Sequence, residues 1–427
     1  MTQLTIRKVI GREILDSRGK PTVEAEVFLE GGAIGRASVP SGASTGTAEA
    51  CELRDGEARY DGMGTRKAAD HVSQVLSKVV SGLSACEQAE IDNRMLEADG
   101  TPNKGNLGAN AILAVSLATA RAAATGKQVL LCEHLRQLIR ELAPESARWQ
   151  ASLSIPFPMT NMISGGKHAG GNLDFQDILI IPHGAANYPE ALEWIVRVYR
   201  RLGTLLTKSG FEGYLVGDEG GYGPRLHSNQ QAVEMVVEAI SLASLRPGQD
   251  VSLAIDVASS HFYREGAYHL AAEKGKRLSA HDMIDRLEAW VDAYPIVSIE
   301  DGLAEDDFAG WQLLTQRLGS RVKLVGDDLF ATNSARLTTG ITMGAANSIL
   351  IKVNQIGSLS ETLETLILAD KHNYGTVVSA RSGETEDDFL ADLSVAADAD
   401  HIKVGSIARS ERLSKYNQLL RLHETLG

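Results

Sequence analysis

Short apolar segments that end in a polar residue recur in the second half of the sequence. Residues 348–351 form an apolar run with the β-branched content of a buried strand, Lys352 follows directly, and a helical pattern begins at Ser358. The same arrangement precedes further polar residues: Asp256, Glu300, Asp327, Arg381 with Ser382, and Lys403. This alternation predicts successive βα units, as in an eightfold β/α barrel, in which the C-terminal ends of the strands meet on one face.

Ionisable side chains at such a face are candidates for chemistry, because the active sites of these barrels lie there. Three acids predict a site for a hard cation such as Mg²⁺, which prefers oxygen ligands. Lys352 and Lys403 beside such a metal can bind an anion or release a proton. The alternative is a set of structural ion pairs at the barrel rim, or lysines that reach into solvent. The shared position at strand ends favours the functional interpretation.

The first part of the chain has a different pattern. Residues 3–10 and 22–29 alternate between apolar and polar positions, as half-buried strands do. Residues 65–80, 87–97 and 108–124 have helical periodicity. This mixture of strands and helices predicts a separate α+β domain that precedes the barrel.

The fold class that we predict is therefore α/β, with two domains. The N-terminal α+β domain occupies residues 1–135, a linker occupies 136–150, and the β/α barrel occupies 151–427. Within the barrel, residues 190–208 place apolar side chains on one face of a helix, as a helix that covers the barrel should. A last helix over residues 411–424 closes the barrel.

Loops rich in glycine and small polar residues interrupt these elements. One spans residues 39–46 and contains Ser41, a second spans 161–172 and contains Lys167 and His168, and a third spans 217–223 and contains Asp218 and Glu219. A lone histidine is more often a structural hydrogen-bonding group than a catalyst, and a polar loop is often a mere connection. From composition alone, these loops stay without a function.

Charge and composition exclude several classes of protein. The 427 residues include 55 acidic and 42 basic side chains, which gives a net charge of −13 and disfavours non-specific binding to nucleic acid. An anionic substrate must then be attracted by a local positive site. The three isolated cysteines have no metal-ligand spacing and suit a reduced cytoplasmic protein. No signal peptide or membrane span is predicted, because the longest apolar tract is rich in alanine and contains Arg121.

Long sequence motifs add to this picture, because they occur in the order seen in one known family. The N-terminal motifs are Asp-Ser-Arg-Gly at 16–19, Val-Pro-Ser-Gly-Ala-Ser-Thr-Gly at 39–46 and Leu-Gly-Ala-Asn-Ala-Ile-Leu at 107–113. Those of the barrel are His-Ala-Gly-Gly at 168–171, Gly-Asp-Glu-Gly-Gly at 217–221, Ser-Ile-Glu-Asp at 298–301, Lys-Val-Asn-Gln-Ile-Gly at 352–357, Arg-Ser-Gly-Glu-Thr-Glu-Asp at 381–387 and Ala-Arg-Ser-Glu-Arg at 408–412. On these motifs, nearly the whole chain resembles the enolase (phosphopyruvate hydratase) family.

The resemblance implies a reaction and a role for each strand-end residue. Enolases remove a proton next to a carboxylate and then expel the neighbouring hydroxyl, which converts 2-phosphoglycerate to phosphoenolpyruvate in glycolysis. By resemblance, the first Mg²⁺ is held by Asp256, Glu300 and Asp327, and a second, substrate-dependent Mg²⁺ is held with help from Ser41. Lysine bases with Mg²⁺ are typical of this superfamily.

The remaining roles implied by the resemblance concern the base and the anionic groups of the substrate. Lys352 is the base, and its pKa must fall, which nearby positive charge from Mg²⁺ and Lys403 would cause. Lys403 also faces the substrate carboxylate, while Arg381 and Ser382 hold the phosphate. His168 belongs to a loop that orders over the substrate, and the loop containing Ser41 closes over it.

Two positions depart from the family pattern, both on the side of the leaving group. Asp177 stands where the family has a glutamate that works with Glu219, and Ala380 stands where the family has a histidine. A carboxylate shifted by about one ångström can lower a rate on the order of 100-fold. The groups for metal binding and proton abstraction are kept, whereas the groups that help the hydroxyl to leave are changed.

Three functions are consistent with this pattern. The first is an enolase that acts on 2-phosphoglycerate. The second is a paralogue from phosphonate natural-product biosynthesis, similar to carboxyphosphonoenolpyruvate synthase, with a leaving group that needs less acid assistance. The third is a non-catalytic scaffold, which the retained ligands and base disfavour. The resemblance also predicts a homodimer or an assembly of dimers, with no nucleic-acid or membrane partner.

Overall fold

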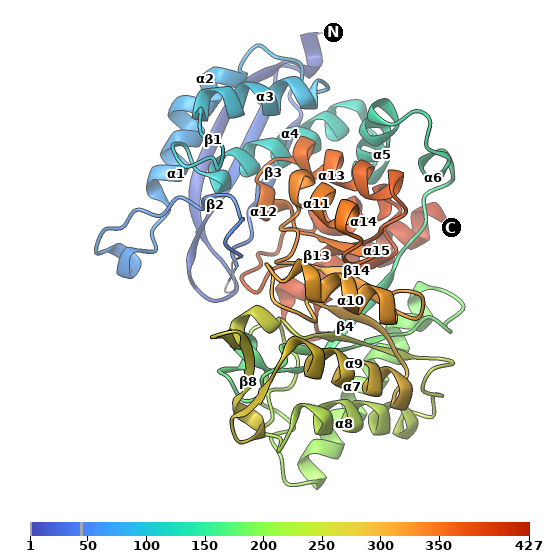
Figure 1. The fold of residues 1–427 in the computed structure, drawn as a ribbon. Helices are drawn as coiled ribbons and strands as arrows, with labels where there is room; N and C mark the ends of the chain where they lie inside the picture. The colour runs from blue at the N-terminus through green and yellow to red at the C-terminus, as the bar shows by residue number, and fades with distance from the viewer. Residues whose placement is uncertain (1, 43–45) are drawn as a thin grey trace.

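The computed structural model describes residues 2–42 and 46–427, which form a smaller N-terminal part and a larger barrel (Figure 1). The N-terminal sheet is antiparallel and consists of β1 (Ile6–Leu15), β2 (Pro21–Leu29) and β3 (Ile34–Ser38). The first strand starts and ends later than the predicted range of 3–10. Arg12, in its second half, pairs across the sheet with Glu24 and Glu26 at 2.6 Å each. Such polar cross-strand pairs stabilise a strand without the apolar alternation on which the prediction relied.

Helical segments pack on this sheet: α1 (Arg66–His71), a π-helical segment (Val72–Leu76), α2 (Ser77–Val80) and α4 (Ala109–Lys127). A further helix, α3 (Gln88–Asp99), packs on α2 and α4. Short 3₁₀ turns lie at Thr2–Leu4 and Arg59–Gly62. The helical ranges predicted here are confirmed to within a few residues. The backbone of α4 lies directly on β3, since a Cβ added to Gly35 would lie 2.1 Å from the carbonyl oxygen of Ala118. Only glycine permits so close an approach.

The stretch predicted as a linker, 136–150, is largely helical. α5 (Leu131–Leu142) runs through its first part, and α6 (Ala147–Gln150) lies at its end. Arg136 is fully buried, and its Nε donates a hydrogen bond of 2.5 Å to the carbonyl oxygen of Ala396 in the barrel. These contacts attach α5 to the barrel helix α14 (Phe389–Ala396).

The second part is a closed barrel with the strand order β10-β11-β12-β13-β14-β4-β5-β6. The strands are β4 (Phe157–Ser164), β5 (Asp177–Ile181), β6 (Ser252–Asp256), β10 (Ile296–Glu300), β11 (Lys323–Gly326), β12 (Ser348–Ile351), β13 (Gly375–Ser379) and β14 (His401–Gly405). Buried apolar side chains from alternate positions fill the interior of the barrel: Met159, Leu179, Ile181, Ala254, Val325, Leu350 and Val377. The barrel predicted from the sequence is thus confirmed.

Helices surround the barrel. They are α7 (Tyr188–Lys208), α8 (Asn229–Leu242), α9 (Ala280–Ala293), α10 (Phe308–Leu318), α11 (Ser334–Met343), α12 (Val353–Ile356), α13 (Leu359–Lys371), α14 and α15 (Ser410–Leu426). A small sheet of β7 (Tyr263–Arg264), β8 (Ala267–Leu270) and β9 (Lys276–Leu278) follows β6, with 3₁₀ turns at Ser259–Phe262 and Ala271–Glu273. The predicted helices over 190–208 and 411–424 correspond to α7 and α15.

One strand of the barrel runs against the others. From β6 onward the strands are parallel, but β5 is antiparallel to both β4 and β6. Asp177 is the first residue of β5 and pairs in register with Asp256, the last residue of β6. The reversal therefore brings the start of β5 to the barrel end at which the other strands finish.

The loop predicted over residues 161–172 begins later than expected. β4 continues to Ser164, and a 3₁₀ turn spans Gly166–Ala169. Asn161 and Ser164 are polar but fully buried, and the Nδ2 of Asn161 donates to the Oγ of Ser164 at 2.9 Å. Polar residues of this kind are typical of loops, which explains the predicted boundary. Here they belong to the end of a strand that faces a polar site and not the apolar core.

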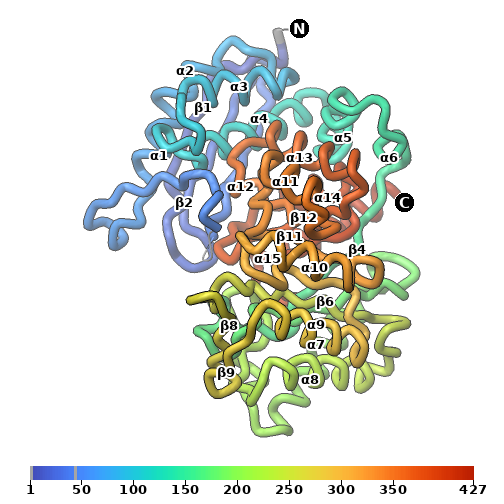
Figure 2. The backbone as a smooth tube through the Cα atoms, in the orientation of Figure 1, coloured from blue at the N-terminus to red at the C-terminus, as the bar shows by residue number. Residues whose placement is uncertain are grey.

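The N-terminal part lies against only one half of the barrel (Figure 2). Its α3 and α4 contact α13 and α12, whereas α7, α8 and α9 lie far from it. Arg121 of α4 joins the two parts through ion pairs with Asp387 at 2.8 Å and Asp388 at 2.7 Å.

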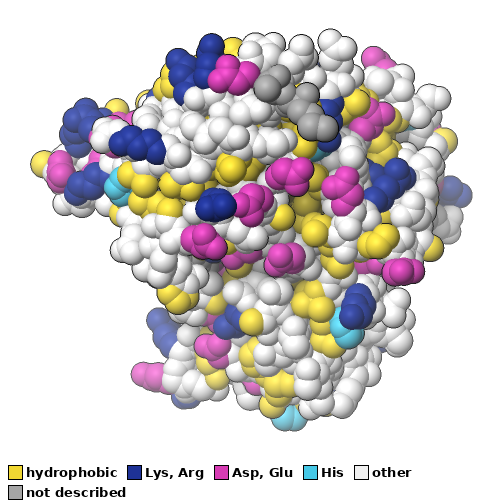
Figure 3. All heavy atoms as spheres, turned by 90° about the horizontal axis from the view of Figure 1, so that it is seen from above, with side chains coloured by type: hydrophobic (Ala, Val, Ile, Leu, Met, Phe, Trp, Pro, Cys, Tyr) yellow, Lys and Arg dark blue, Asp and Glu magenta, His cyan; other side chains and the backbone are white. Residues whose placement is uncertain are grey.

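The surface carries both signs of charge. On the face shown in Figure 3, Lys and Arg side chains lie among Asp and Glu side chains. Within the described residues, no helix combines the length and apolar character that a bilayer span requires.

Candidate active site

Three buried acids stand at the ends of neighbouring barrel strands. Asp256 ends β6, Glu300 ends β10 in register with it, and Asp327 follows β11. Each is at most 5% exposed. Apolar runs bury these strands and leave their terminal carboxylates facing the barrel mouth. The donor atoms are all carboxylate oxygens, which suit Mg²⁺ better than softer metals.

Two buried lysines lie directly on these acids. The Nζ of Lys403 is 2.8 Å from Asp256 and 2.8 Å from both carboxylate oxygens of Glu300, and the Nζ of Lys352 donates to the Oδ2 of Asp327. Burial lowers the pKa of Lys352, but the charge of Asp327 outweighs it, so this pKa is raised in the protein alone. A lowered pKa is expected for Lys352 only when Mg²⁺ is bound nearby, because the charge of the ion would oppose that of the protonated lysine. In this structure, the positive charges of Lys352 and Lys403 offset the negative charges of the three carboxylates.

A second group of acids lies beside the first. Oxygens of Asp301, Asp327 and Asp328 are within 4.8 Å of one another, close enough to hold one ion. Asp301 accepts hydrogen bonds from the backbone amides of Asp327 at 2.9 Å and Asp328 at 2.8 Å. Burial and the neighbouring charge of Asp327 raise the pKa of Asp328 to about 7. This cluster also fits an oxygen-liganded cation, and it shares Asp327 with the triad expected from the sequence.

The expected metal triad shares Asp327 with a group of acids at ligand spacing. Two groups of three acidic or histidine side chains at ligand spacing occur in the part of the chain that the structure describes, and the triad of Asp256, Glu300 and Asp327 is not one of them. The two lysines lie among its carboxylates. The triad stays a prediction, while buried acidic clusters suitable for a metal are a feature of the structure.

The other group contains Asp177 and Glu219, expected near the leaving group, and His168 of the loop expected to order over the substrate. The Nδ1 of His168 lies 2.9 Å from the Oδ2 of Asp177, and its Nε2 lies 3.8 Å from Glu219. Asn161 donates to the second oxygen of Asp177. The loop after β4, the start of β5 and the loop 217–223 thus bring these three side chains together, and all are buried.

Arg381 and Ser382, the expected phosphate ligands, lie at the end of β13 and are buried. The guanidinium of Arg381 donates to both oxygens of Glu49, at 3.0 and 3.1 Å, and to Asn354 at 2.8 Å. The hydroxyl of Ser382 accepts a hydrogen bond of 3.3 Å from Arg18. The arginine fork therefore already holds one carboxylate of the protein.

Ser41 is joined to this region through its backbone. Its amide donates to the carbonyl oxygen of Gly383 at 2.8 Å, and the amide of Gly383 donates back at 2.9 Å. The Ser41 hydroxyl donates to Glu52 and accepts from Arg54. Residues 43–45 of the predicted loop 39–46, which is expected to close over the substrate, lie outside the described residues.

Ala380, the second position expected to depart from the family pattern, is buried between Ser379 and Arg381. Its amide donates to the carbonyl oxygen of Lys403 at 2.8 Å, which pairs β13 with β14. The methyl side chain of Ala380 offers no group for proton transfer. On the side of the expected leaving group, His168, Asp177 and Glu219 are ionisable.

Sequence analysis missed several side chains of this site. Gln176 donates to Asp256 at 3.0 Å, and Gln355 donates to Asp327 at 2.8 Å. Asp301 and Gln355 lie inside motifs already noted, at 298–301 and 352–357, so their position in those motifs was an available signal. Glu49 had no such signal, because it contacts Arg381 across 332 residues of sequence.

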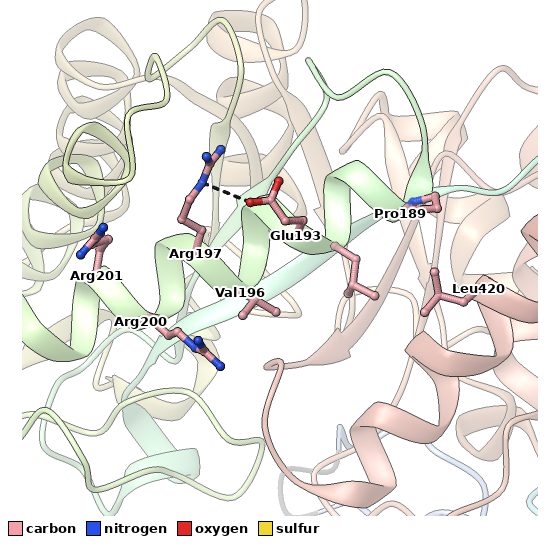
Figure 4. Close-up of a pocket in the computed structure, with 8 residues that line it drawn as sticks. Pro189, Glu193, Val196, Arg197, Arg200, Arg201 and Leu420 are labelled. Carbon is pink, nitrogen blue, oxygen red and sulfur yellow. Dashed lines mark ion pairs between the residues drawn. The ribbon is translucent and has the colours of Figure 1, made fainter.

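A separate hollow of about 690 Å³ lies on the outer side of the barrel (Figure 4). It is lined by α7 and α15 through Pro189, Leu192, Glu193, Val196, Arg197, Arg200, Arg201 and Leu420. Arg197 pairs with Glu193 at 3.7 Å. The hollow is far from the strand ends and lacks the lysine and acid pairs found there, so it is not the candidate active site.

Both parts of the chain match models of a known family. The family model described as "Enolase, N-terminal domain" matches residues 6–135, and the model described as "Enolase, C-terminal TIM barrel domain" matches residues 152–427. Together the two matches cover the sheet, the barrel and all strand-end residues described above. The chain therefore belongs to the enolase family.

Proposed function

We propose that the protein is a Mg²⁺-dependent lyase that converts 2-phosphoglycerate to phosphoenolpyruvate and water. The observation that carries this proposal is the pair of buried lysines, Lys352 and Lys403, set among strand-end carboxylates beside Arg381. A base, a cation for a carboxylate and a guanidinium for a phosphate are the groups that this elimination requires. Membership of the enolase family supports the same reaction.

The residues of the barrel fit a Mg²⁺ ion. Asp256, Glu300 and Asp327 would hold the first ion, and Ser41 would help to hold a second that enters with the substrate. When bound, Mg²⁺ would offset the negative charge that develops on the substrate carboxylate. The oxygen-only donor set and its burial support this assignment.

The chain's own groups would perform the proton transfers. Lys352 takes the proton from the carbon next to the carboxylate, and the electrons of that bond form the new double bond. Arg381 and Lys403 both lower the pKa of Lys352, opposing Asp327, so engagement of Asp327 by a cation would favour the neutral base. Lys403 holds the substrate carboxylate, and Arg381 with Ser382 holds the phosphate.

The leaving hydroxide must gain a proton to depart as water. Burial lowers the pKa of His168, but Asp177 and Glu219 outweigh it and raise this pKa to about 9. His168 is thus a protonated group on the side of the expected leaving group at neutral pH. Asp177 orients His168 through one hydrogen bond, while Glu219 lies 3.8 Å from the Nε2 of His168 and acts on it through its charge.

A second function is favoured by the two departures at this side. Ala380 supplies no imidazole, and Asp177 is held by His168 and Asn161. A paralogue with a leaving group better than hydroxide, as in carboxyphosphonoenolpyruvate synthesis, would need less acid assistance. A non-catalytic scaffold is the least supported function, because both lysines and the acids are retained.

One assay tests the proposal directly. Purified protein with Mg²⁺ and 2-phosphoglycerate is expected to form phosphoenolpyruvate, followed by its ultraviolet absorbance, while exchange of the α-proton with deuterated water is followed by NMR. Exchange without product would support the paralogue. Absence of both despite bound Mg²⁺ would exclude 2-phosphoglycerate as the substrate.

Assembly and location belong to the same proposal. We expect a homodimer or an assembly of dimers in the cytoplasm, as is usual for the family. The motifs at 16–19 and 409–412 motivated this expectation, and within the chain Arg18 binds Asp16 while Arg412 is fully buried. Light scattering at micromolar concentration tests it, and the mass of a single chain would contradict it.

A further inference from the structure

The bond between Glu49 and Arg381 occupies the atoms that the proposed function assigns to the substrate phosphate. The two terminal nitrogens of Arg381 donate to the two carboxylate oxygens of Glu49, at 3.0 and 3.1 Å. The Arg381 side chain is 3% exposed and that of Glu49 is 8% exposed. A paired, planar contact of this kind is the geometry with which an arginine fork also binds phosphate.

Neighbouring groups hold both partners in place. The Oδ1 of Asn354 accepts from Arg381 at 2.8 Å, and its Nδ2 donates to the carbonyl oxygen of Pro40 at 3.1 Å. The carboxylate of Glu49 also accepts from the amide of Gly46 at 3.1 Å. The Glu49 carboxylate is therefore fixed on the fork and is not a mobile surface group.

The charges around the Glu49–Arg381 pair favour displacement of the Glu49 carboxylate from Arg381 by an incoming anion. Asp328 and Glu305 lie close to the same segment, since a Cβ on Gly46 would be 3.1 Å and 3.3 Å from their oxygens. Glu49 is thus an acid placed beside other acids, and within the described residues the cation paired with it is Arg381. An arriving dianion attracts the guanidinium more strongly than one carboxylate does, because Coulomb energy scales with charge.

We propose that Glu49 is an internal competitor that holds the anion-binding fork of Arg381 until a doubly charged phosphate or phosphonate group displaces it. This inference rests on the proposed function, because it takes Arg381 as the phosphate ligand. Glu49 thereby acts as a specificity-determining residue. Singly charged anions, such as simple carboxylates, gain too little at the fork to replace it, whereas a phosphate monoester gains enough.

The test measures binding of inorganic phosphate by calorimetry, with Mg²⁺ present and the full chain used throughout. Glu49→Gln removes the competing charge and is expected to tighten phosphate binding about tenfold or more, the scale of charge-assisted hydrogen bonds. Glu57→Gln removes the same charge at a side chain that is 67% exposed and pairs with Lys67, and it should leave binding unchanged. Acetate should bind measurably to Glu49→Gln and not to the unaltered protein.

Two further variants make the result decisive. Arg381→Lys should weaken phosphate binding in both the unaltered and the Glu49→Gln background, since a lysine cannot form the fork. Glu49→Asp keeps the negative charge but shortens the side chain, so it should tighten phosphate binding by less than Glu49→Gln does. If Glu49→Gln does not fold, Glu49→Asp takes its place in the test.

Unchanged or weaker phosphate binding in Glu49→Gln, together with a loss in Arg381→Lys, would overturn the inference and make Glu49 a support for the fork. Phosphate affinity that does not change in Arg381→Lys would also overturn the inference. Neither measurement requires turnover. A protein that shows the Glu49 effect but does not convert 2-phosphoglycerate would refute the proposed reaction and leave this inference standing.

Discussion

The Nδ1 of His168 lies 2.9 Å from the Oδ2 of Asp177, and both side chains are buried. Burial raises the pKa of Asp177 to about 6 even though His168 opposes it, while the pKa of His168 is raised to about 9. At pH 7 the two groups therefore form an ion pair. Asp177 is thus the closest partner that keeps His168 charged.

Replacing Asp177 by Asn should lower the pKa of His168, because the closest negative charge is removed while burial continues to disfavour the imidazolium. NMR titration of the histidine side chains measures this pKa. His372→Gln, at an exposed site beyond α13, provides the assignment control. An unchanged His168 pKa would mean that Glu219 alone keeps this histidine charged.

The raised pKa of His168 also has a consequence for stability. A group with a raised pKa in the folded state contributes stability that is fully present below its unfolded value of about 6.5 and is lost as pH rises through about 9. The free energy of unfolding should therefore fall between these pH values, and less so in His168→Gln. Denaturant titrations at several pH values measure both slopes, and equal slopes would contradict the assignment.

Restoring the family residues with Asp177→Glu and Ala380→His together should raise the rate of phosphoenolpyruvate formation and leave α-proton exchange little changed. Lys352 and the metal ligands, the groups proposed to serve the exchange step, are not altered. The two substitutions are tested jointly, because groups that act on one transition state are not additive. If the unaltered protein already dehydrates 2-phosphoglycerate as fast as the double variant, the departures are tolerated variation.

Asp256→Asn should weaken Mg²⁺ binding by at least about tenfold, since it removes one of the charges proposed to hold the ion. Calorimetry without substrate measures this affinity. Asp292→Asn removes an acid that is 62% exposed on α9 and should change nothing. Equal affinities in all three proteins would shift the metal to the cluster of Asp301, Asp327 and Asp328, which Asp301→Asn then tests.

Arg412→Met should destabilise the protein by at least about 3 kcal/mol, because it leaves buried carbonyl groups without a donor. Arg412 is fully buried and donates to the carbonyl oxygens of Arg381 at 2.6 Å, Ser382 at 2.7 Å and Val404 at 3.1 Å. Arg421→Met, on the same helix at 61% exposure, should stay within about 0.5 kcal/mol. Denaturant unfolding compares the two variants, and similar losses would contradict this role for Arg412.

The sequence was sufficient to predict the barrel, because its apolar runs and the polar residues after them follow directly from burial of parallel strands. It could not reveal that β5 is reversed, since five buried residues in a row look the same in either direction. The strand-end residues Asp256, Glu300 and Lys403 were predicted for the same reason as the strands. Their mutual pairing was not, because periodicity carries no information on which charged side chains meet.

The contact of Glu49 with Arg381 shows the same limit more strongly. It joins a residue after the predicted loop 39–46 to the end of β13, and no local pattern relates two positions so far apart. Resemblance to the family supplied the expected role of Arg381 but no partner for it within the chain. Such contacts become visible only when the N-terminal part is placed on the barrel.

The position of Lys403 on β14 determines when the site can exist during synthesis. Lys403 follows Asp256 by 147 residues and Glu300 by 103, and β14 closes the barrel on β4 through His401 and Phe157, which are 244 residues apart. Closure over such a separation is among the slow steps of folding. Until the last strand leaves the ribosome, the acids at the barrel mouth lack this counter-charge, and burying them unpaired is costly. We therefore expect the nascent chain to keep its barrel open until almost all of it has been made.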